Sequence, residues 1–236
     1  MLAGSVVLIA GFVLRQHRTA NPLLPGRVVA DRTRAGAYLA GAFLAAGMFG
    51  MFLLLPYYLQ DQLSFGPLAT GLAIVPFSAA LVATSLLVPR LLRRTSEKAV
   101  LVTGLTLATL AMAGLASAIG QPDALPGVLI TTTVMGAGIG LVYPPLNSSV
   151  VSAVAVDDVG VASATFSVSQ QLGGAVGVAL LNGGYVIISG SAAGQAATGA
   201  LWITFLFATA LYLAATHVAL TVLPGRRAGL GKLSNG

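Results

Sequence analysis

The 236-residue chain is 56% hydrophobic and only 8% charged. An ordinary soluble domain carries about 25% charged residues, so a water-soluble globular fold is excluded. The formal charge is +6, and the twelve basic residues lie in three short clusters beside apolar runs. This pattern is typical of membrane topology and excludes a nucleic-acid-binding surface. The absence of cysteine excludes disulfides and thiolate metal sites.

The apolar runs predict an all-α membrane protein, a bundle of six transmembrane helices preceded by part of another. Residues 1–14 are apolar but lack the basic start and the cleavage site of a signal peptide, so we interpret them as the end of a preceding transmembrane helix. A polar connector follows at 15–35. The bundle is expected at 36–223, with spans at 36–59, 67–89, 99–120, 125–151, 160–188 and 198–223, each long enough for a hydrocarbon core about 30 Å thick.

The basic residues are confined to some of the polar segments around these spans. All Lys and Arg residues lie in the segments 15–35, 90–98 and 225–236, whereas the links at 60–66, 121–124 and 189–197 contain none. Because basic loops stay on the cytoplasmic side, we expect a multi-pass protein of the cell membrane with a cytoplasmic connector and a cytoplasmic tail at 224–236. The link at 152–159, which is placed inside, carries Asp157 and Asp158 and no base, and it is uninformative because Asp has little weight in setting topology.

Neutral polar side chains inside the spans are candidates for a substrate cavity, because a polar group in lipid needs a partner. No Asp, Glu, Lys or Arg lies near the middle of a span. Pro144 and Pro145 should kink the fourth span, where two of the candidates stand one turn apart. Lining a polar cavity and hydrogen bonding between helices account equally well for these residues. The candidates are Tyr57, Tyr143, Asn147, Gln170 and Gln171.

Small residues form a stripe along the fifth span. Small residues let helix backbones approach closely in lipid, so packing is the favoured interpretation and a ligand site the alternative. Gly136 and Gly140 of the fourth span are interpreted in the same way. The spacing of catalytic, metal-ligating or phosphate-binding residues is absent, so neither an enzyme nor a cofactor is expected. The stripe comprises Ser163, Ser167, Gly173, Gly174 and Gly177.

Three segments, in this order, resemble the 14-helix drug:proton antiporter branch of the major facilitator superfamily. The first is Asn21-Pro22-Leu23-Leu24-Pro25 with Arg32-Thr33. The second is Tyr57-Tyr58-Leu59-Gln60, followed by Phe65-Gly66-Pro67-Leu68-Ala69-Thr70-Gly71-Leu72 and Pro76. The third is Gly160-Val161-Ala162-Ser163 with Gln170-Gln171-Leu172-Gly173-Gly174-Ala175-Val176-Gly177. The resemblance covers nearly the whole chain.

This resemblance implies that 36–223 is the C-terminal six-helix bundle and that 1–14 ends the second of two extra central helices. It implies that the first and fourth helices line the cavity, while the second and fifth face the other bundle, which would place the stripe of the fifth span at the bundle interface. Arg90, Arg93 and Arg94 occupy the position of the family's cytoplasmic gating motif. The motif's usual Asp is missing, so a topological role is favoured for these arginines.

The function that the resemblance implies is proton-coupled efflux of small lipophilic or cationic substrates by alternating access. The partners would be the bilayer, protons and an N-terminal half that carries the acidic proton-coupling residues. Two alternatives stay open: a half-transporter that pairs with a second copy of itself, and a membrane subunit that does not transport.

Overall fold

The computed structural model describes residues 11, 15, 31–152, 154–190 and 195–222. Nearly all of the predicted helix at 1–14 and of the connector at 15–35, and the whole tail at 224–236, lie outside the described residues. The described part of the chain is helical and contains no β-strand, so the predicted all-α fold is confirmed.

Six long helices make up the bundle. Every one is long and apolar enough to cross a membrane. The observed helix ends differ from the predicted spans by at most four residues. The helices are α3 (Arg32–Tyr57), which continues as the π-helix η1 (Tyr58–Gln62), α4 (Pro67–Leu92), α5 (Glu97–Ala118), α6 (Ala124–Val151), α7 (Val159–Ser189), which follows the 3-10 turn η2 (Val156–Asp158), and α8 (Gln195–Val222).

The largest difference from the predicted spans is at the start of α3, four residues earlier than expected. Asp31 is the N-cap residue, and its carboxylate accepts a hydrogen bond from the backbone N–H of Arg34 at 3.0 Å. Such a side chain satisfies an N–H group that the first turn of a helix leaves open, so the helix begins inside the polar segment and brings Arg32 and Arg34 with it.

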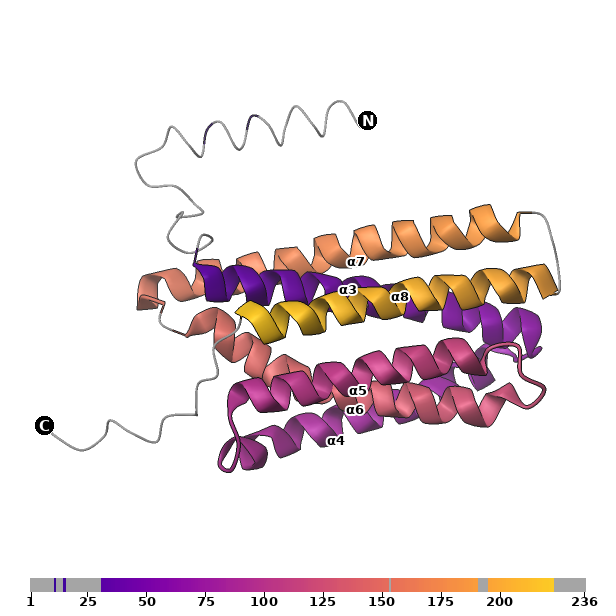
Figure 1. Ribbon diagram of the computed structural model, residues 1–236, viewed down its shortest axis with the longest axis horizontal. Helices are drawn as coiled ribbons and strands as arrows, with labels where there is room; N and C mark the ends of the chain where they lie inside the picture. The colour runs from indigo at the N-terminus through magenta and orange to yellow at the C-terminus, as the bar shows by residue number, and fades with distance from the viewer. Residues whose placement is uncertain (1–10, 12–14, 16–30, 153, 191–194, 223–236) are drawn as a thin grey trace, which may run out of the picture.

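Helices α3 and α4 make their main contacts with helices that are remote in the chain, whereas α5 and α6 are neighbours both in sequence and in space. In Figure 1, α7, α3 and α8 lie together on one side, and α5, α6 and α4 lie on the other. In chain order, α3, α4 and α5 form the first set of three helices, and α6, α7 and α8 form the second. Helix α6 contacts α4 and α5 as α3 contacts α7 and α8. Because three crossings separate each helix from its counterpart, the two sets run in opposite directions through the membrane. This is an inverted-topology repeat.

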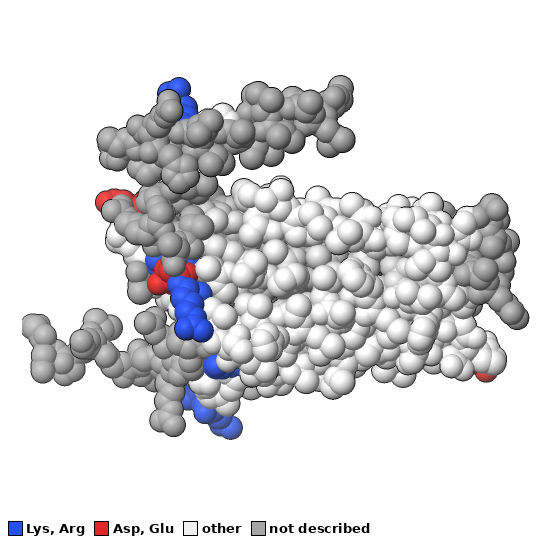
Figure 2. All heavy atoms as spheres, turned by 45° about the horizontal axis from the view of Figure 1, so that its top comes forward, with Lys and Arg blue, Asp and Glu red and all other residues white. Residues whose placement is uncertain are grey.

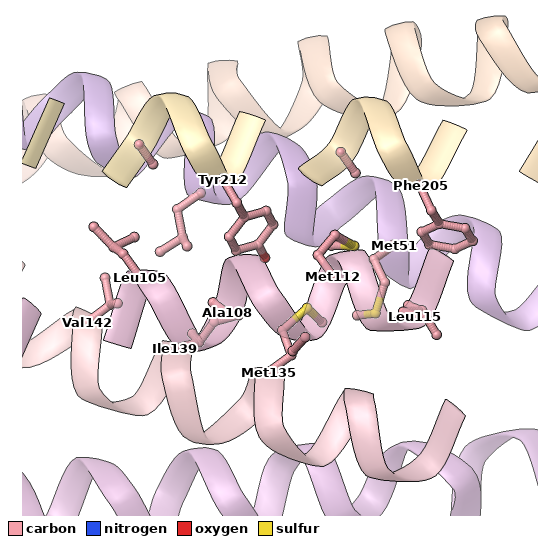
Figure 3. Close-up of a cluster of buried hydrophobic side chains, with 14 of the residues drawn as sticks. Met51, Leu105, Ala108, Met112, Leu115, Met135, Ile139, Val142, Phe205 and Tyr212 are labelled. Carbon is pink, nitrogen blue, oxygen red and sulfur yellow. The ribbon is translucent and has the colours of Figure 1, made fainter. Parts of the chain in front are cut away.

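The centre of the bundle is filled by large apolar side chains from four helices. Figure 3 shows Phe205 and Tyr212 of α8 reaching toward Met112 of α5, with Met135 of α6 and Met51 of α3 close by. All five side chains are fully buried. A hydrogen bond of 3.3 Å between the hydroxyl groups of Thr109 and Thr216 also joins α5 to α8. The two halves of the repeat therefore share one core.

Charged side chains gather at one end of the bundle. Figure 2 shows the Lys and Arg residues of the described part at that end and a long uncharged middle. The cluster comprises the start of α3, the end of α4 and the start of α5, with Arg32, Arg34, Arg90, Arg93, Arg94 and Lys98. The links at the opposite end contain Asp61 and Asp123. The middle of the bundle thus matches a hydrocarbon layer with an interface at each end.

Candidate functional site

A hydrogen bond joins two of the predicted cavity residues. The phenol of Tyr143 on α6 donates to the side-chain amide oxygen Oε1 of Gln170 on α7, at 3.4 Å. Both residues are partly buried. This bond links α6 and α7, which otherwise have few contacts. The structure therefore places a neutral polar pair between the fourth and fifth helices of the bundle.

Asn147 lies one turn beyond this pair, toward the charged end. Its amide nitrogen Nδ2 donates to the backbone carbonyl of Tyr143 at 3.0 Å, and the residue remains exposed. Helix α6 continues through Pro144 and Pro145 to Val151. Each proline lacks an N–H group, so two carbonyls in the preceding turn lose their partner in the helix. Together these groups form a polar stretch in the last three turns of α6.

Tyr57 and Gln171 do not join this pair. Tyr57 lies at the far end of α3, where its ring centroid is 6.4 Å from that of Tyr185 on α7. Fifteen residues separate Gln170 from Tyr185, which corresponds to about 22 Å along the helix. Gln171 is exposed on the next face of α7. The predicted cavity residues thus form two separate groups, a polar one near the charged end and an aromatic one near the opposite end.

The glycines of the fifth-span stripe pack against α3. A methyl group on Gly173 would overlap the backbone of Ala42, and one on Gly177 would overlap the backbone of Ala46. Gly174 lies against the ring of Phe49. These contacts are inside the bundle. A second bundle is not part of the structure, so the assignment of these glycines to an interface between bundles stays a prediction.

The two serines of the stripe behave differently. Ser163 and Ser167 are exposed, and the hydroxyl of Ser167 donates to the Ser163 carbonyl of its own helix at 3.1 Å. They lie at four-residue spacing with Gln171, so the three form one polar, uncovered line along α7. This line belongs to a different face of the helix from Gly173 and Gly177.

Helices α4 and α6 also meet along a line of close backbone contact, here called a seam, like the one between α3 and α7. A methyl group on Gly136 would overlap the backbone of Phe77, and one on Gly140 would overlap that of Leu81. Close packing of these glycines was predicted and is confirmed. The hydroxyl of Thr84 crosses the seam and lies 2.9 Å from the carbonyl of Ala137, which accepts its hydrogen bond. The pairs α3–α7 and α4–α6 are therefore both built on backbone contact.

The basic loop between α4 and α5 is exposed. Arg90 lies in the last turn of α4, where a cation is favourable for the helix dipole, and Arg93 and Arg94 follow the helix end. In the part of the chain that the structure describes, no carboxylate is within ion-pair distance of these three guanidinium groups. The geometry therefore adds nothing to the gating interpretation, which stays a prediction.

The residues that follow this loop tie three helix ends together. Lys98 Nζ donates to the backbone carbonyl of Leu220 on α8 at 2.7 Å. The hydroxyl of Ser148 on α6 donates to the carboxylate of Glu97 at 3.0 Å. Sequence reasoning missed both contacts, because Lys98 and Leu220 are remote in the chain and nothing in the local pattern predicts their pairing.

Two helices are poorly covered by the rest of the bundle. In their most apolar stretches, only 11% of the residues of α4 and 22% of those of α7 are buried, against 61% for α3. Helices α4 and α7 are the second and fifth of the bundle. They therefore present most of their surface outward, either to lipid or to another protein body.

Comparison with known proteins identifies the family. Residues 2–178, about three quarters of the chain, match the family model of the Major Facilitator Superfamily. The chain belongs to the Major Facilitator Superfamily. Its inverted repeat of three plus three helices is the architecture of one six-helix half in this superfamily. Members of the superfamily are transporters, so the expectation that the chain is not an enzyme is confirmed.

Curated relatives within the Major Facilitator Superfamily are drug and antibiotic resistance proteins. The chain is 38% identical to the puromycin resistance protein pur8 of Streptomyces alboniger over 187 residues, which cover 77% of this chain and 37% of the relative. It is 35% identical to the multidrug resistance protein B homolog of Mycobacterium tuberculosis over 180 residues, 75% of this chain and 33% of that protein. A lincomycin resistance protein of Streptomyces lincolnensis is 31% identical over 239 residues, 96% of this chain and 46% of the relative. The chain thus spans between a third and a half of these relatives.

Two further residues at these sites escaped sequence reasoning. Tyr185 is one of the few aromatic residues in the fifth span, and its position near the span end is the usual signal of an interface aromatic. That signal does not reveal its pairing with Tyr57. Thr84 resembles any threonine that bonds to its own helix, and indeed its hydroxyl also lies 2.9 Å from the Ala80 carbonyl.

Proposed function

We propose that this chain is the C-terminal half of a proton-coupled multidrug efflux transporter that works by alternating access. The observation that carries the proposal is the exposure of α4 and α7, the two helices that leave most of their surface outside the bundle. Alternating access requires two bundles that rock about a site at their interface, and each must offer the other a surface.

The exposed surface of α7 is too polar to be explained by lipid contact alone. Ser163, Ser167 and Gln171 lie uncovered on one line. An amide such as Gln171 in hydrocarbon lacks partners, whereas a second bundle or a water-filled cavity would supply them. This line continues toward Tyr143 and Gln170, so the substrate cavity is proposed beside the surface that the second bundle covers.

The chemistry of the proposed cavity suits small lipophilic or cationic compounds. The Tyr143–Gln170 pair and the exposed Asn147 are neutral, and the ring of Tyr143 is aromatic. The separate pair of Tyr57 and Tyr185 offers further aromatic faces at the opposite end of the bundle. Aromatic faces attract organic cations without an obligatory carboxylate. The names of the relatives, which refer to puromycin, lincomycin and multiple drugs, support the same class of substrate.

Proton coupling is assigned to the other half. Within the described helices, Asp, Glu, Lys and Arg occur only in the terminal turns, so no carboxylate is placed to take up a proton at the centre. The basic end of the bundle is proposed to face the cytoplasm, because Lys and Arg concentrate on that side of a cell membrane.

Efflux of a fluorescent lipophilic cation tests this function. The chain is expressed alone, and also together with the N-terminal region of the puromycin resistance protein, in bacteria that lack their own efflux pumps. We expect export only from the combination, and we expect a protonophore to abolish it. Robust proton-dependent export by the chain alone would contradict the half-transporter proposal. Correct insertion of both proteins without any export would contradict the transport proposal.

Crosslinking tests the alternative in which two copies pair. The chain has no cysteine, so Ser167→Cys introduces a single thiol on the uncovered line of α7. Gly174 is unsuitable because it is buried against Phe49. A crosslink between two copies through Cys at 167, with no crosslink from an equivalent Leu110→Cys variant on α5, would favour self-pairing. Monomers in both variants favour a different partner.

A further inference from the structure

An apolar groove runs along the junction of α3 and α7. It has a volume of about 410 Å³, which is in the range of small-molecule sites of roughly 300–1,000 Å³. Its walls include Leu39 and Phe43 of α3, Leu172, Val176 and Leu180 of α7, and Leu211 of α8. The floor is the glycine seam, where Gly173 and Gly177 lie directly against the backbones of Ala42 and Ala46.

The groove offers an occupant almost no polar group. Ser169 lies in its wall, but its hydroxyl already donates to the Phe166 carbonyl at 2.7 Å. The oxygen of Tyr38, which also lines the groove, is buried beneath the surface. None of the described residues that line it is charged. A ligand here is therefore held by apolar contact, and it must itself be an apolar chain or ring.

The length of the groove matches one leaflet of a bilayer. Along α7 the groove extends from Ser169 to Leu180, which is about 16 Å of helix. The hydrocarbon core is about 30 Å thick, so the groove covers close to half of it. Leu39 lies seven residues from Arg32, the first residue of α3, so the groove begins about 10 Å below the charged end of the bundle.

The positively charged side chain of Arg32 lies on the same face of α3 as the groove. Arg32, Leu39 and Phe43 are spaced by seven and four residues, which places them on one side of the helix. Arg32 is exposed, and side chains of a helix lean toward its N-terminus, so this guanidinium extends into the interface above the groove. Arginine binds phosphate groups through its fork of N–H donors.

The groove also lies away from the surface proposed for the second bundle. The uncovered polar line Ser163, Ser167 and Gln171 is on a different face of α7 from Leu172, Val176 and Leu180, and Leu211 of α8 closes the groove on its own side. The leucine and valine of this face are more than half exposed, with Leu172 at 62% and Val176 at 55%. In a membrane such a face meets lipid.

We infer that this groove binds one acyl chain of an anionic phospholipid whose phosphate is held by Arg32. The apolar length of the groove selects the chain, and the guanidinium at its upper end selects the negative headgroup. This site is independent of the transport activity and of the orientation of the bundle. It would fix a lipid between the first and fifth helices of the bundle.

Quenching of tryptophan fluorescence by brominated lipids tests this inference. Trp202 is the only tryptophan, so Trp202→Phe gives a silent background. Leu172→Trp then places a reporter at the groove, and Leu110→Trp on α5 is the control. Leu110 is 64% exposed, close to Leu172, and both residues lie 13 positions from the charged end of their helices, so the two reporters sit at equal depth. The full chain is reconstituted in phosphatidylcholine with increasing brominated phosphatidylglycerol.

We expect the groove reporter to prefer phosphatidylglycerol over phosphatidylcholine about fivefold, the ratio that corresponds to about 1 kcal/mol for one basic residue near an anionic group. The control reporter should show a ratio near one. Arg32→Gln should reduce the groove ratio to near one, whereas Arg93→Gln, an exposed arginine at the same end, should leave it unchanged.

Three outcomes would overturn the inference. One is an equal preference at both reporters, which would mean that the groove holds only bulk lipid. Another is a preference that survives Arg32→Gln, which would remove the phosphate contact. The last is a groove reporter that no brominated lipid quenches, including brominated phosphatidylcholine, because that would show a protein surface covering the groove.

Discussion

Gly177 of α7 lies so close to the backbone of Ala46 of α3 that there is no room for a methyl group between them. The same relationship recurs one turn earlier, between Gly173 and Ala42. Helix packing in a membrane relies on such close approach, because lipid chains are as apolar as the side chains that they would replace. The α3–α7 seam is therefore a principal source of stability in the bundle.

Gly177→Ala is expected to destabilise the bundle by about 1–3 kcal/mol, since overpacking forces the two backbones apart. The measurement is the free energy of unfolding in a denaturing detergent titration. Gly183→Ala on the same helix is the control, because nothing lies within 4 Å of a methyl group there. That control should be neutral or stabilising by up to about 1 kcal/mol, as alanine favours helix over glycine. Equal destabilisation by both changes would contradict the seam.

Thr84→Val is expected to weaken the α4–α6 seam by about 0.6 kcal/mol, the average for hydrogen bonds between membrane helices. The valine keeps the shape of the side chain and removes the bond to the Ala137 carbonyl. Thr133→Val is the control, because its hydroxyl bonds only to Leu129 of its own helix. The same unfolding titration applies, and a larger loss for Thr133→Val would show that the interhelical bond is unimportant.

Tyr143→Phe and Gln170→Leu are expected to be coupled, because each removes one partner of the same bond. A double-mutant cycle on the free energy of unfolding should give a coupling energy below about 1 kcal/mol, since the bond is long at 3.4 Å. Repeating the cycle with Tyr57→Phe in place of Tyr143→Phe should give no coupling with Gln170. Tyr57 contacts Tyr185, which lies about 22 Å along α7 from Gln170. Coupling of equal size in both cycles would argue against the two-group description.

Lys98→Met is expected to destabilise the charged end by about 0.5–1.5 kcal/mol, the range for an ordinary intramolecular hydrogen bond, because the bond is exposed and water can replace the ammonium group. The methionine preserves the apolar stem of the side chain and leaves the Leu220 carbonyl without its donor. The loss should show as faster hydrogen exchange in the last turn of α8. Arg93→Met is the control for removal of a positive charge at the same end, and it should leave that exchange rate unchanged.

Membrane topology is testable because the chain contains no cysteine. Arg94→Cys and Gln121→Cys each place one exposed thiol on a link, at opposite ends of the bundle. With the proposed orientation, an impermeant maleimide added to intact cells labels position 121 and reaches position 94 only after the cells are opened. The reverse pattern would contradict a cytoplasmic basic end.

Much of the fold follows from the sequence because the bilayer constrains it strongly. Apolar runs that are too long for loops must cross the membrane as helices, and α4 begins at Pro67, the residue at which the sequence predicts its start. The start of α3 was missed by four residues. There a cap, Asp31, extends the helix into a segment that composition alone classes as polar.

The candidate site was less predictable than the fold. The sequence groups Tyr57 and Tyr143 together because both are tyrosines within the spans. Two such side chains meet only if they lie at the same depth in the bundle, and these two lie near opposite ends. Gly174 and Gly177 were recognised as packing residues, yet the partner helix depends on tertiary arrangement. A stripe of small residues fits any neighbour with a smooth surface, so its pairing with Ala46 is a property of the whole bundle.

The crossed pairing of the helices has a consequence for how the protein is made. Helix α3 packs mainly on α7 and α8, and α4 packs on α6, whereas neighbours in the chain such as α3 and α4 hardly touch. When α3 leaves the ribosome, the segment that will cover it does not begin until Val159. Helix α3 must therefore wait in the bilayer for its main partners, whereas α4 and α5 can pack as soon as α6 is made. A chain interrupted before α7 would leave the glycine-facing side of α3 without its partner.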